Sequence, residues 1–196
     1  SDLDGLVFMH SAFKLLDLDA AFKAKMVDEQ LTYLRAALEE AEEAEEGSGK
    51  SKAPRVKQIE KQIEAMEEKL KAALSGVGKD KNVRFDELGV DMLYVDEAHE
   101  FRRLEFGTAR QAKGIQPAGS ARAFDRWMKT RWLEERNPGR SLVMASGTPV
   151  TNTLAELYNV IRFMKPQALE EQGLDDFDSW AAMFGREVSE LEPNPA

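Results

Sequence analysis

The most informative stretch of this sequence is Asp91-Met92-Leu93-Tyr94-Val95-Asp96-Glu97-Ala98-His99. Residues 92–95 form a short apolar run that favours strand structure, and we interpret it as a buried parallel strand. Two acidic residues follow it directly. Ligands of α/β proteins bind at the carboxyl ends of parallel strands, so residues 96–99 are the first candidate for chemistry.

Two other short apolar runs predict strands. Residues 141–145 resemble residues 92–95 in length and composition, and the turn formers of residues 146–149 end them. Residues 6–11, Leu-Val-Phe-Met-His-Ser, predict a third buried strand. Because predicted helices alternate with these strands, we expect an α/β fold with a parallel sheet and flanking helices.

Two of these helices have recognisable starts. Ser120 is placed to cap a helix that runs to about Arg136, and residues 153–156 form a capping box at the start of another. Trp127 and Trp132 fall on the apolar side of the first helix. Tryptophans at helical spacing are usually core residues, which we prefer to a role in stacking on nucleic-acid bases.

Residues 19–75 predict a pair of long helices. Apolar residues recur at alternating steps of three and four between residues 27 and 41, and again between residues 56 and 73. This spacing predicts an antiparallel coiled-coil hairpin, projecting from an α/β body of residues 1–18 and 76–188. We expect its Glu-rich outer face to be solvated, with a partner-binding arm as the alternative. The acidic tail, residues 189–196, is expected to fray.

The predicted tip of this hairpin has a misleading motif. Residues 47–51 read Gly-Ser-Gly-Lys-Ser, like the end of a phosphate-binding P-loop. A P-loop also needs a glycine at position 44, which is Ala44, and a strand before it instead of an acidic helix. We therefore reject these residues as a nucleotide site.

Charge is unevenly distributed along the 196 residues. The net charge is −9, yet residues 100–140 hold ten Lys and Arg against five Asp and Glu. Local charge decides whether a phosphate backbone can dock, although a solvated helix face is an equally good interpretation. The candidate phosphate contacts are Arg102, Arg103, Arg122, Arg126 and Lys129.

Composition excludes several classes of protein. The sequence has no cysteine, which excludes disulfides and Cys-ligated metal sites, and it has two histidines, His10 and His99. No apolar run approaches the roughly 18 residues of a membrane span, and no secretory leader is visible. A cytoplasmic protein without a membrane partner is the simplest interpretation.

Two adjacent acids at a strand end suit phosphoryl transfer. One carboxylate can hold Mg²⁺ while the other orients and polarises the attacking water. Asp96-Glu97-Ala98-His99 and Ser146-Gly147-Thr148-Pro149, in this order, resemble motifs II and III of superfamily-2 helicases and translocases. The surrounding residues resemble the Swi/Snf-like helicase region of phage- and plasmid-borne helicase–DNA methylase fusion proteins. The matching segments are residues 85–91, 95–101, 148–152 and 155–158.

The resemblance implies a role for each motif residue. Asp96 would coordinate Mg²⁺, and Glu97 would activate the hydrolytic water. His99 would couple the nucleotide site to motif III, in which Ser146, Gly147 and Thr148 would relay nucleotide state to bound DNA. ATP and Mg²⁺ are the implied cofactors of the intact protein.

The sequence also departs from the family pattern. It has no P-loop, no second RecA-like lobe with an arginine finger, and no methylase motif. We therefore expect part of a first RecA-like lobe that alone binds no cofactor and is inactive. Its expected partners are DNA, the remaining helicase lobes and a methylase domain, while the hairpin's partner is unknown. The competing hypotheses are a coiled-coil interaction module on a non-catalytic platform and a metal-dependent hydrolase that uses Asp96 and Glu97 without ATP.

Overall fold

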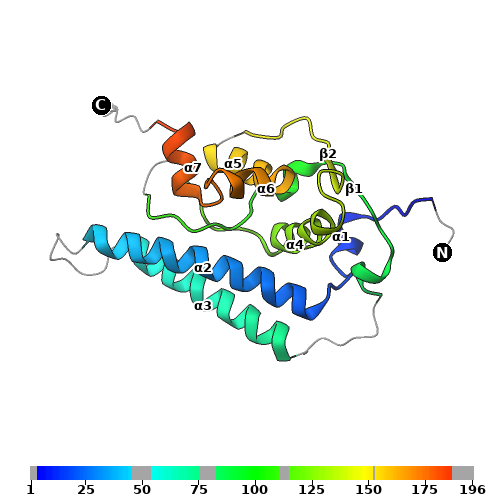
Figure 1. Cartoon of the computed structure of the whole chain (residues 1–196), viewed down its shortest axis with the longest axis horizontal. Helices are drawn as coiled ribbons and strands as arrows, with labels where there is room; N and C mark the ends of the chain where they lie inside the picture. The colour runs from blue at the N-terminus through cyan, green and yellow to red at the C-terminus, as the bar shows by residue number, and fades with distance from the viewer. Residues whose placement is uncertain (1–3, 46–53, 76–82, 111–114, 152, 187–196) are drawn as a thin grey trace, which may run out of the picture.

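The protein is mostly helical with one small parallel sheet. The computed structural model describes residues 4–45, 54–75, 83–110, 115–151 and 153–186, so the P-loop-like residues 47–51 lie outside the described part. In chain order, the described elements are α1 (His10–Phe13), α2 (Ala20–Glu45), α3 (Pro54–Ser75), η1 (Phe85–Glu87), β1 (Leu93–Val95), η2 (Ala98–Phe101), α4 (Ala121–Arg136), β2 (Leu142–Met144), α5 (Leu154–Met164), α6 (Pro166–Glu171) and α7 (Phe177–Phe184) (Figure 1).

The sheet confirms two of the three predicted strands. β1 pairs in parallel with β2, with Leu93 opposite Leu142 and Val95 opposite Met144. The prediction that β1 is a buried strand holds for one face only, because Val95 is buried while Tyr94 is 76% exposed. Its cross-strand partner Val143 is exposed as well. The described elements therefore cover only one face of the sheet.

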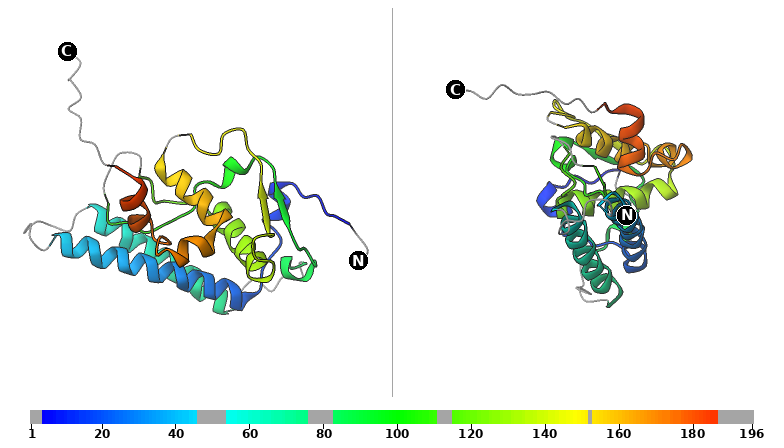
Figure 2. Two further views of the ribbon diagram at one scale, coloured as in Figure 1. Left: turned by 45° about the horizontal axis from the view of Figure 1, so that its top comes forward. Right: turned by 90° about the vertical axis from the view of Figure 1, so that its left-hand side faces the viewer.

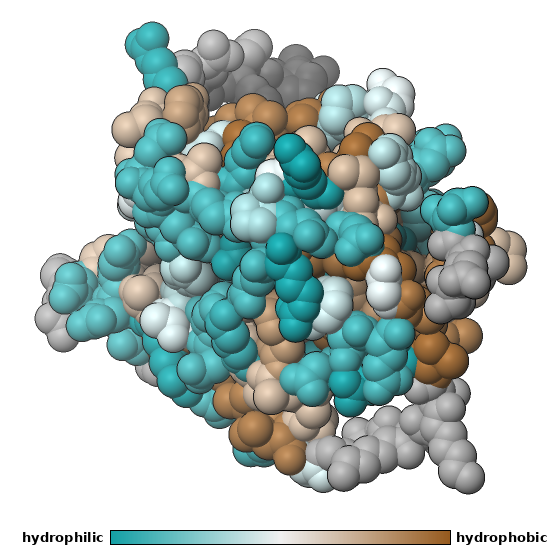
Figure 3. Space-filling view, turned by 45° about the vertical axis from the view of Figure 1, so that its right-hand side comes forward, coloured by the Kyte–Doolittle hydropathy of each residue, from teal (hydrophilic) through white to brown (hydrophobic). Residues whose placement is uncertain are grey.

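The strand predicted at residues 6–11 is wrong. Residues 5–9 have no regular structure, and the chain enters α1 at His10. Leu6, Val7, Phe8 and Met9 are all exposed, Val7 completely so. An apolar run becomes a strand only where another strand accepts its backbone hydrogen bonds, and no described residue does so here. Apolar patches interrupt the hydrophilic surface on the side of the molecule shown in Figure 3.

The helix starts confirm the predicted caps. Ser120 Oγ accepts a hydrogen bond from the backbone N–H of Ala123, which caps α4. Thr153 Oγ1 accepts one from the N–H of Glu156, which caps α5. Trp127 and Trp132 are buried, as core residues should be.

The helical pair is confirmed, but its projection from the body is not. α2 and α3 run antiparallel and side by side along one side of the molecule (Figures 1 and 2). Their buried residues, including Met26 and Ile59, belong to one cluster with Phe13, Phe85 and Trp132 of the body. The hairpin thus contributes a large part of the main core, and it does not stand apart from the body.

Polar contacts join the hairpin to the body as well. Arg55 of α3 donates to the carbonyl of Thr108, and Gln62 donates to the carbonyl of Pro117. Both side chains are buried. A second apolar cluster lies under α5, α6 and α7, around Tyr158, Phe177 and Trp180. No described helix is long and apolar enough to cross a membrane.

Candidate active site

The parallel register brings the two predicted motifs together. Beyond the strands, Ala145 N donates to the carbonyl of Val95 over 2.8 Å, and Ala98 N donates to the carbonyl of Ala145 over 2.9 Å. The chain therefore leaves β1 and β2 at the same edge of the sheet. Asp96 and Glu97 follow one strand there, and Ser146 follows the other.

Glu97 has an unusual backbone. Its φ of 49° and ψ of 43° lie in the left-handed region, and it is the one non-glycine residue with positive φ among those described. Asp96 Oδ1 accepts from the N–H of Glu97 over 2.9 Å. This tight turn at Asp96 and Glu97, which we call the acidic turn, leaves both carboxylates exposed. Such conformations cost about 1–3 kcal/mol and concentrate at functional sites.

His99 contacts both motifs through one ring nitrogen. Its Nδ1 lies 3.1 Å from Oε2 of Glu97 and 3.5 Å from Oγ of Ser146. Ser146 Oγ also accepts from the N–H of Thr148 over 3.1 Å. His99 is thus positioned between the acidic turn and the segment that follows β2.

His10 contacts the backbone of the acidic turn, a role that no sequence motif indicates. Arg126 Nη2 lies 3.2 Å from His10 Nδ1, while His10 Nε2 lies 3.1 Å from the carbonyl oxygen of Asp96. An arginine can only donate, so Nδ1 accepts and Nε2–H donates to Asp96. No local sequence pattern could have revealed a contact between residues 86 positions apart.

Comparison with known proteins decides the family. A family model described as "Probable helicase domain" matches residues 1–194. The chain belongs to this helicase-domain family. Defense against restriction protein B of Escherichia phage P1 is 27% identical to the helicase domain over 131 residues, which is 63% of this chain. Helicase SWR1 of Kluyveromyces lactis is 34% identical over 105 residues, and that of Saccharomyces cerevisiae is 31% identical, each over 50% of this chain.

The helicase domain is small beside these relatives. It spans about 6% of the length of each of the three. No solved structure matches it. The family assignment therefore rests on the family model, and the motif geometry above is independent of it.

Two predicted DNA contacts are buried in the helicase domain. Lys129 is fully buried, and its Nζ donates to the carbonyl of Phe13 and to Asp125. The Arg126 guanidinium lies 3.9 Å from the ring centre of Phe13 and 4.6 Å from that of Phe101. Burial lowers the pKa of Arg126 to about 10 and lowers that of Lys129. Neither side chain can reach a phosphate backbone in this conformation.

The other three arginines differ from one another. Arg103 is exposed. Arg122 is partly exposed and forms an ion pair with Glu100 over 2.6 Å. Arg102 is only 18% exposed and contacts residues of the helicase domain through two of its nitrogens. Only Arg103 and Arg122 are therefore accessible candidates for phosphate contacts.

The acidic turn suits a magnesium ion that also binds nucleotide phosphates better than one that is held by protein ligands alone. Within the described ranges, no group of three or more His, Asp or Glu side chains could hold a metal ion. Mg²⁺ that also binds nucleotide phosphates needs only one or two protein carboxylates, because water and phosphate complete its shell. The exposed Asp96 carboxylate meets that requirement.

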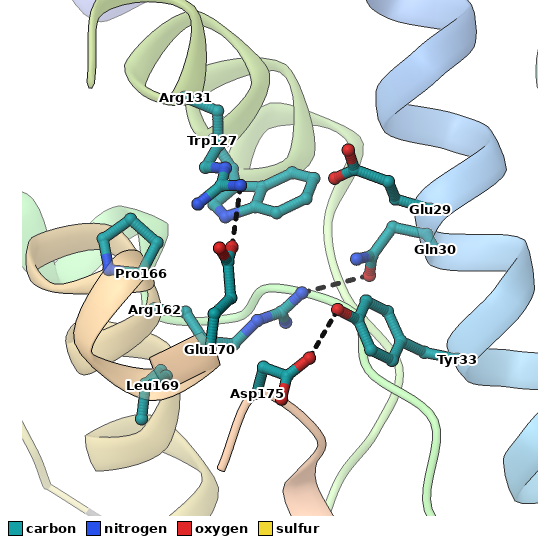
Figure 4. A pocket seen from close by; sticks show the side chains of 10 residues that line it. All are labelled: Glu29, Gln30, Tyr33, Trp127, Arg131, Arg162, Pro166, Leu169, Glu170 and Asp175. Atoms are coloured by element: carbon teal, nitrogen blue, oxygen red, sulfur yellow. Dashed lines mark hydrogen bonds and ion pairs between the residues drawn. The ribbon is translucent and has the colours of Figure 1, made fainter. Parts of the chain in front are cut away.

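A pocket of another kind lies between the hairpin and the body (Figure 4). Arg162 of α5 donates to Oε1 of Gln30 over 3.1 Å, and Tyr33 donates to Asp175 over 2.7 Å. Arg131 of α4 pairs with Glu170 of α6 over 2.9 Å. The first contact joins α2 to the end of α5, the second joins α2 to the segment between α6 and α7, and the third joins α4 to α6. The pocket contains none of the predicted site residues.

Proposed function

We propose that this chain supplies the hydrolysis motif and the coupling motif of an ATP-dependent DNA helicase or translocase of superfamily 2. Membership of the helicase-domain family supports the proposal. The observation that carries it is the position of His99, with Glu97 and Ser146 both in reach of Nδ1. One residue thus joins the predicted water-activating acid to the predicted coupling segment.

The proposed roles follow from position. Asp96 would hold Mg²⁺ together with the nucleotide phosphates, and the ion would supply charge neutralisation. Glu97 orients the attacking water and accepts its proton. His99 and Ser146 report the state of this site to Thr148 and the segment beyond. His10 fixes the backbone of the acidic turn.

Other parts of the enzyme have to come from elsewhere. The 196 residues contain no P-loop, whose N–H groups and lysine hold phosphates in such enzymes. We infer that this chain alone does not hydrolyse ATP and that further helicase lobes in a longer polypeptide complete the site. DNA is the proposed polymer substrate. A methylase domain in the same polypeptide stays a proposal that rests on resemblance.

The test is a pair of substitutions in that longer polypeptide. Glu97→Gln keeps the size of the side chain and should slow ATP hydrolysis by about 10²–10⁴-fold while ATP still binds. Asp96→Asn should weaken Mg²⁺-dependent ATP binding as well. Arg140→Gln is a control at an exposed residue outside both motifs. Near-normal hydrolysis by the Glu97→Gln variant would refute the assignment.

The alternative, a coiled-coil interaction module on a non-catalytic platform, has less support. The inner faces of α2 and α3 are occupied by the body. The outer face of α2 remains exposed at Glu39, Glu42 and Glu43 and could still bind a partner. The two functions are compatible, because the acidic turn lies at the sheet edge and not on the hairpin.

A further inference from the structure

Arg102 lies three residues beyond His99, on the segment that leaves the acidic turn. Its basic charge makes it a candidate phosphate contact, but its contacts point to another role. Nη1 donates to the carbonyl oxygen of Thr148 over 2.9 Å. Nε lies 3.1 Å from Oε1 of Glu156, in the first turn of α5. One guanidinium therefore spans two separate structures.

Both ends of this bridge are held by further contacts. Glu156 uses its other oxygen, Oε2, to accept from the N–H of Thr151 over 2.8 Å. Asn159, one turn along α5, donates from Nδ2 to the carbonyl oxygens of Arg102 and Leu104, each over 2.9 Å. The segment after the acidic turn is thus attached to α5 through both its backbone and its side chain.

The bridge ends on the segment that contacts His99. The N–H of Thr148 donates to Ser146 Oγ, and its carbonyl accepts from Arg102, so both polar groups of the Thr148 backbone are bound. Ser146 Oγ in turn lies 3.5 Å from Nδ1 of His99. Without the Arg102 hydrogen bond, the carbonyl side of Thr148 would be free and Ser146 could move away from His99.

We propose that Arg102 is a positioning residue that holds residues 146–148 against His99, and that it does not bind DNA. This inference rests on the proposed function, because its consequence is the coupling of hydrolysis to movement on DNA. The Glu156 carboxylate beside the guanidinium would repel a phosphate. The side chain is also mostly buried, with two of its donors already engaged.

The test compares Arg102→Lys with Arg102→Gln in the longer helicase polypeptide. Lysine keeps the charge but has a single ammonium group, which cannot reproduce a two-ended guanidinium contact. If Arg102 bridges Thr148 and Glu156, both variants should lower the distance moved on DNA per ATP by about tenfold, with unchanged KM for ATP. Arg103→Lys, at the exposed neighbour, should leave this ratio unchanged. Normal coupling in Arg102→Lys with weaker DNA binding in Arg102→Gln would instead indicate a phosphate contact and overturn the inference.

A second variant covers the case in which Arg102 variants do not fold. Glu156→Gln keeps the side-chain length and an oxygen acceptor for Thr151 but removes the charge opposite Arg102. It should lower the coupling ratio while thermal unfolding stays near that of the parent. Full coupling in a stable Glu156→Gln variant would overturn the inference. Glu97→Gln separates the two proposals: if it abolishes hydrolysis while the Arg102 and Glu156 variants stay fully coupled, only the positioning role fails.

Discussion

Ser146 Oγ lies 3.5 Å from Nδ1 of His99, although 47 positions separate the two residues in the sequence. The same nitrogen lies 3.1 Å from Glu97 Oε2. When Nδ1 carries a hydrogen it donates to Glu97, and when it does not, it accepts from the Ser146 hydroxyl. The contact with Glu97 therefore requires a hydrogen on Nδ1, whereas the contact with Ser146, whose hydroxyl oxygen can also accept, is compatible with either tautomer of the ring.

Removal of the Ser146 hydroxyl should separate hydrolysis from movement. In the longer helicase polypeptide, Ser146→Ala should retain much of the ATPase activity while DNA translocation falls several-fold, because His99 keeps only its Glu97 contact. The contacts described for Thr148 use its backbone, so Thr148→Ala is the matched control and should have a smaller effect. Both rates are measured on the same DNA. Equal loss of ATPase and translocation in the Ser146 variant would argue against a coupling role.

Glycine at position 97 should stabilise the fold while it removes the acid. Glycine adopts positive φ without steric cost, so Glu97→Gly should raise the free energy of unfolding by up to about 1 kcal/mol. Glu97→Gln keeps the steric cost and should change stability by less than about 0.5 kcal/mol. Urea unfolding of the 196-residue chain measures both. A less stable glycine variant would show that residue 97 is not strained.

The hairpin should be indispensable for folding. Replacement of residues 20–74 by a short Gly/Ser linker removes a large part of a shared core, so the remaining chain should lose cooperative unfolding. A milder variant, Ile59→Ala, should cost about 2–5 kcal/mol. Thermal unfolding followed by circular dichroism distinguishes the outcomes. If the deleted chain unfolded sharply, the body would have a core of its own.

Buried and exposed basic residues should behave differently. Lys129→Ala leaves Asp125 without its cation in a partly buried site and should destabilise the chain by about 3 kcal/mol. Arg103→Gln combined with Arg122→Gln should leave stability nearly unchanged. If the chain binds duplex DNA, the logarithm of its binding constant should fall with the logarithm of salt concentration. This double substitution should make that slope shallower by about 0.9 for each phosphate that is no longer neutralised. A stable Lys129→Ala variant with weakened DNA binding would reverse this assignment.

Removal of the Glu29 charge should stabilise the fold at neutral pH but not in acid. It lines the pocket of Figure 4, and burial raises the pKa of its carboxyl group. A raised pKa in the folded state means that the charged form costs stability at neutral pH and that this cost vanishes in acid. Glu29→Gln should therefore raise the Tm at pH 7, with no gain below about pH 4. Glu39→Gln, on the exposed face of the same helix, should show no such gain.

Short-range patterns explain what could be predicted from the sequence. Apolar runs ended by acids or turn formers identified β1 and β2, and hydroxyl residues identified the starts of α4 and α5. The position of Asp96 directly after one predicted strand, and of Ser146 directly after another, identified both as strand-end residues. Each of these signals lies within a few residues of the structure it predicts.

Long-range packing explains what could not be predicted. Nothing near Lys129 indicates that its ammonium group will lie beside the carbonyl of Phe13, 116 residues away. The heptad pattern of the hairpin identified the face where its helices meet, but not the adjoining face that contacts the body. Arg55 and Gln62, polar residues that become buried there, have no apolar pattern to reveal them. The run at residues 6–9 is apolar but lacks a neighbouring strand among the described residues.

The shared core limits how this protein can change over generations. A lineage could vary the exposed glutamates of α2 at less cost than the buried residues of that helix. It could not discard the hairpin in one step, because the descendants would inherit α4 without the neighbours that α2 places around Trp127 and α3 places over Phe124. Each loss of a buried residue on α2 or α3 would favour a compensating change on α1 or α4. The hairpin and the body are therefore expected to diverge together, so that substitutions at their contacting positions are correlated among related sequences.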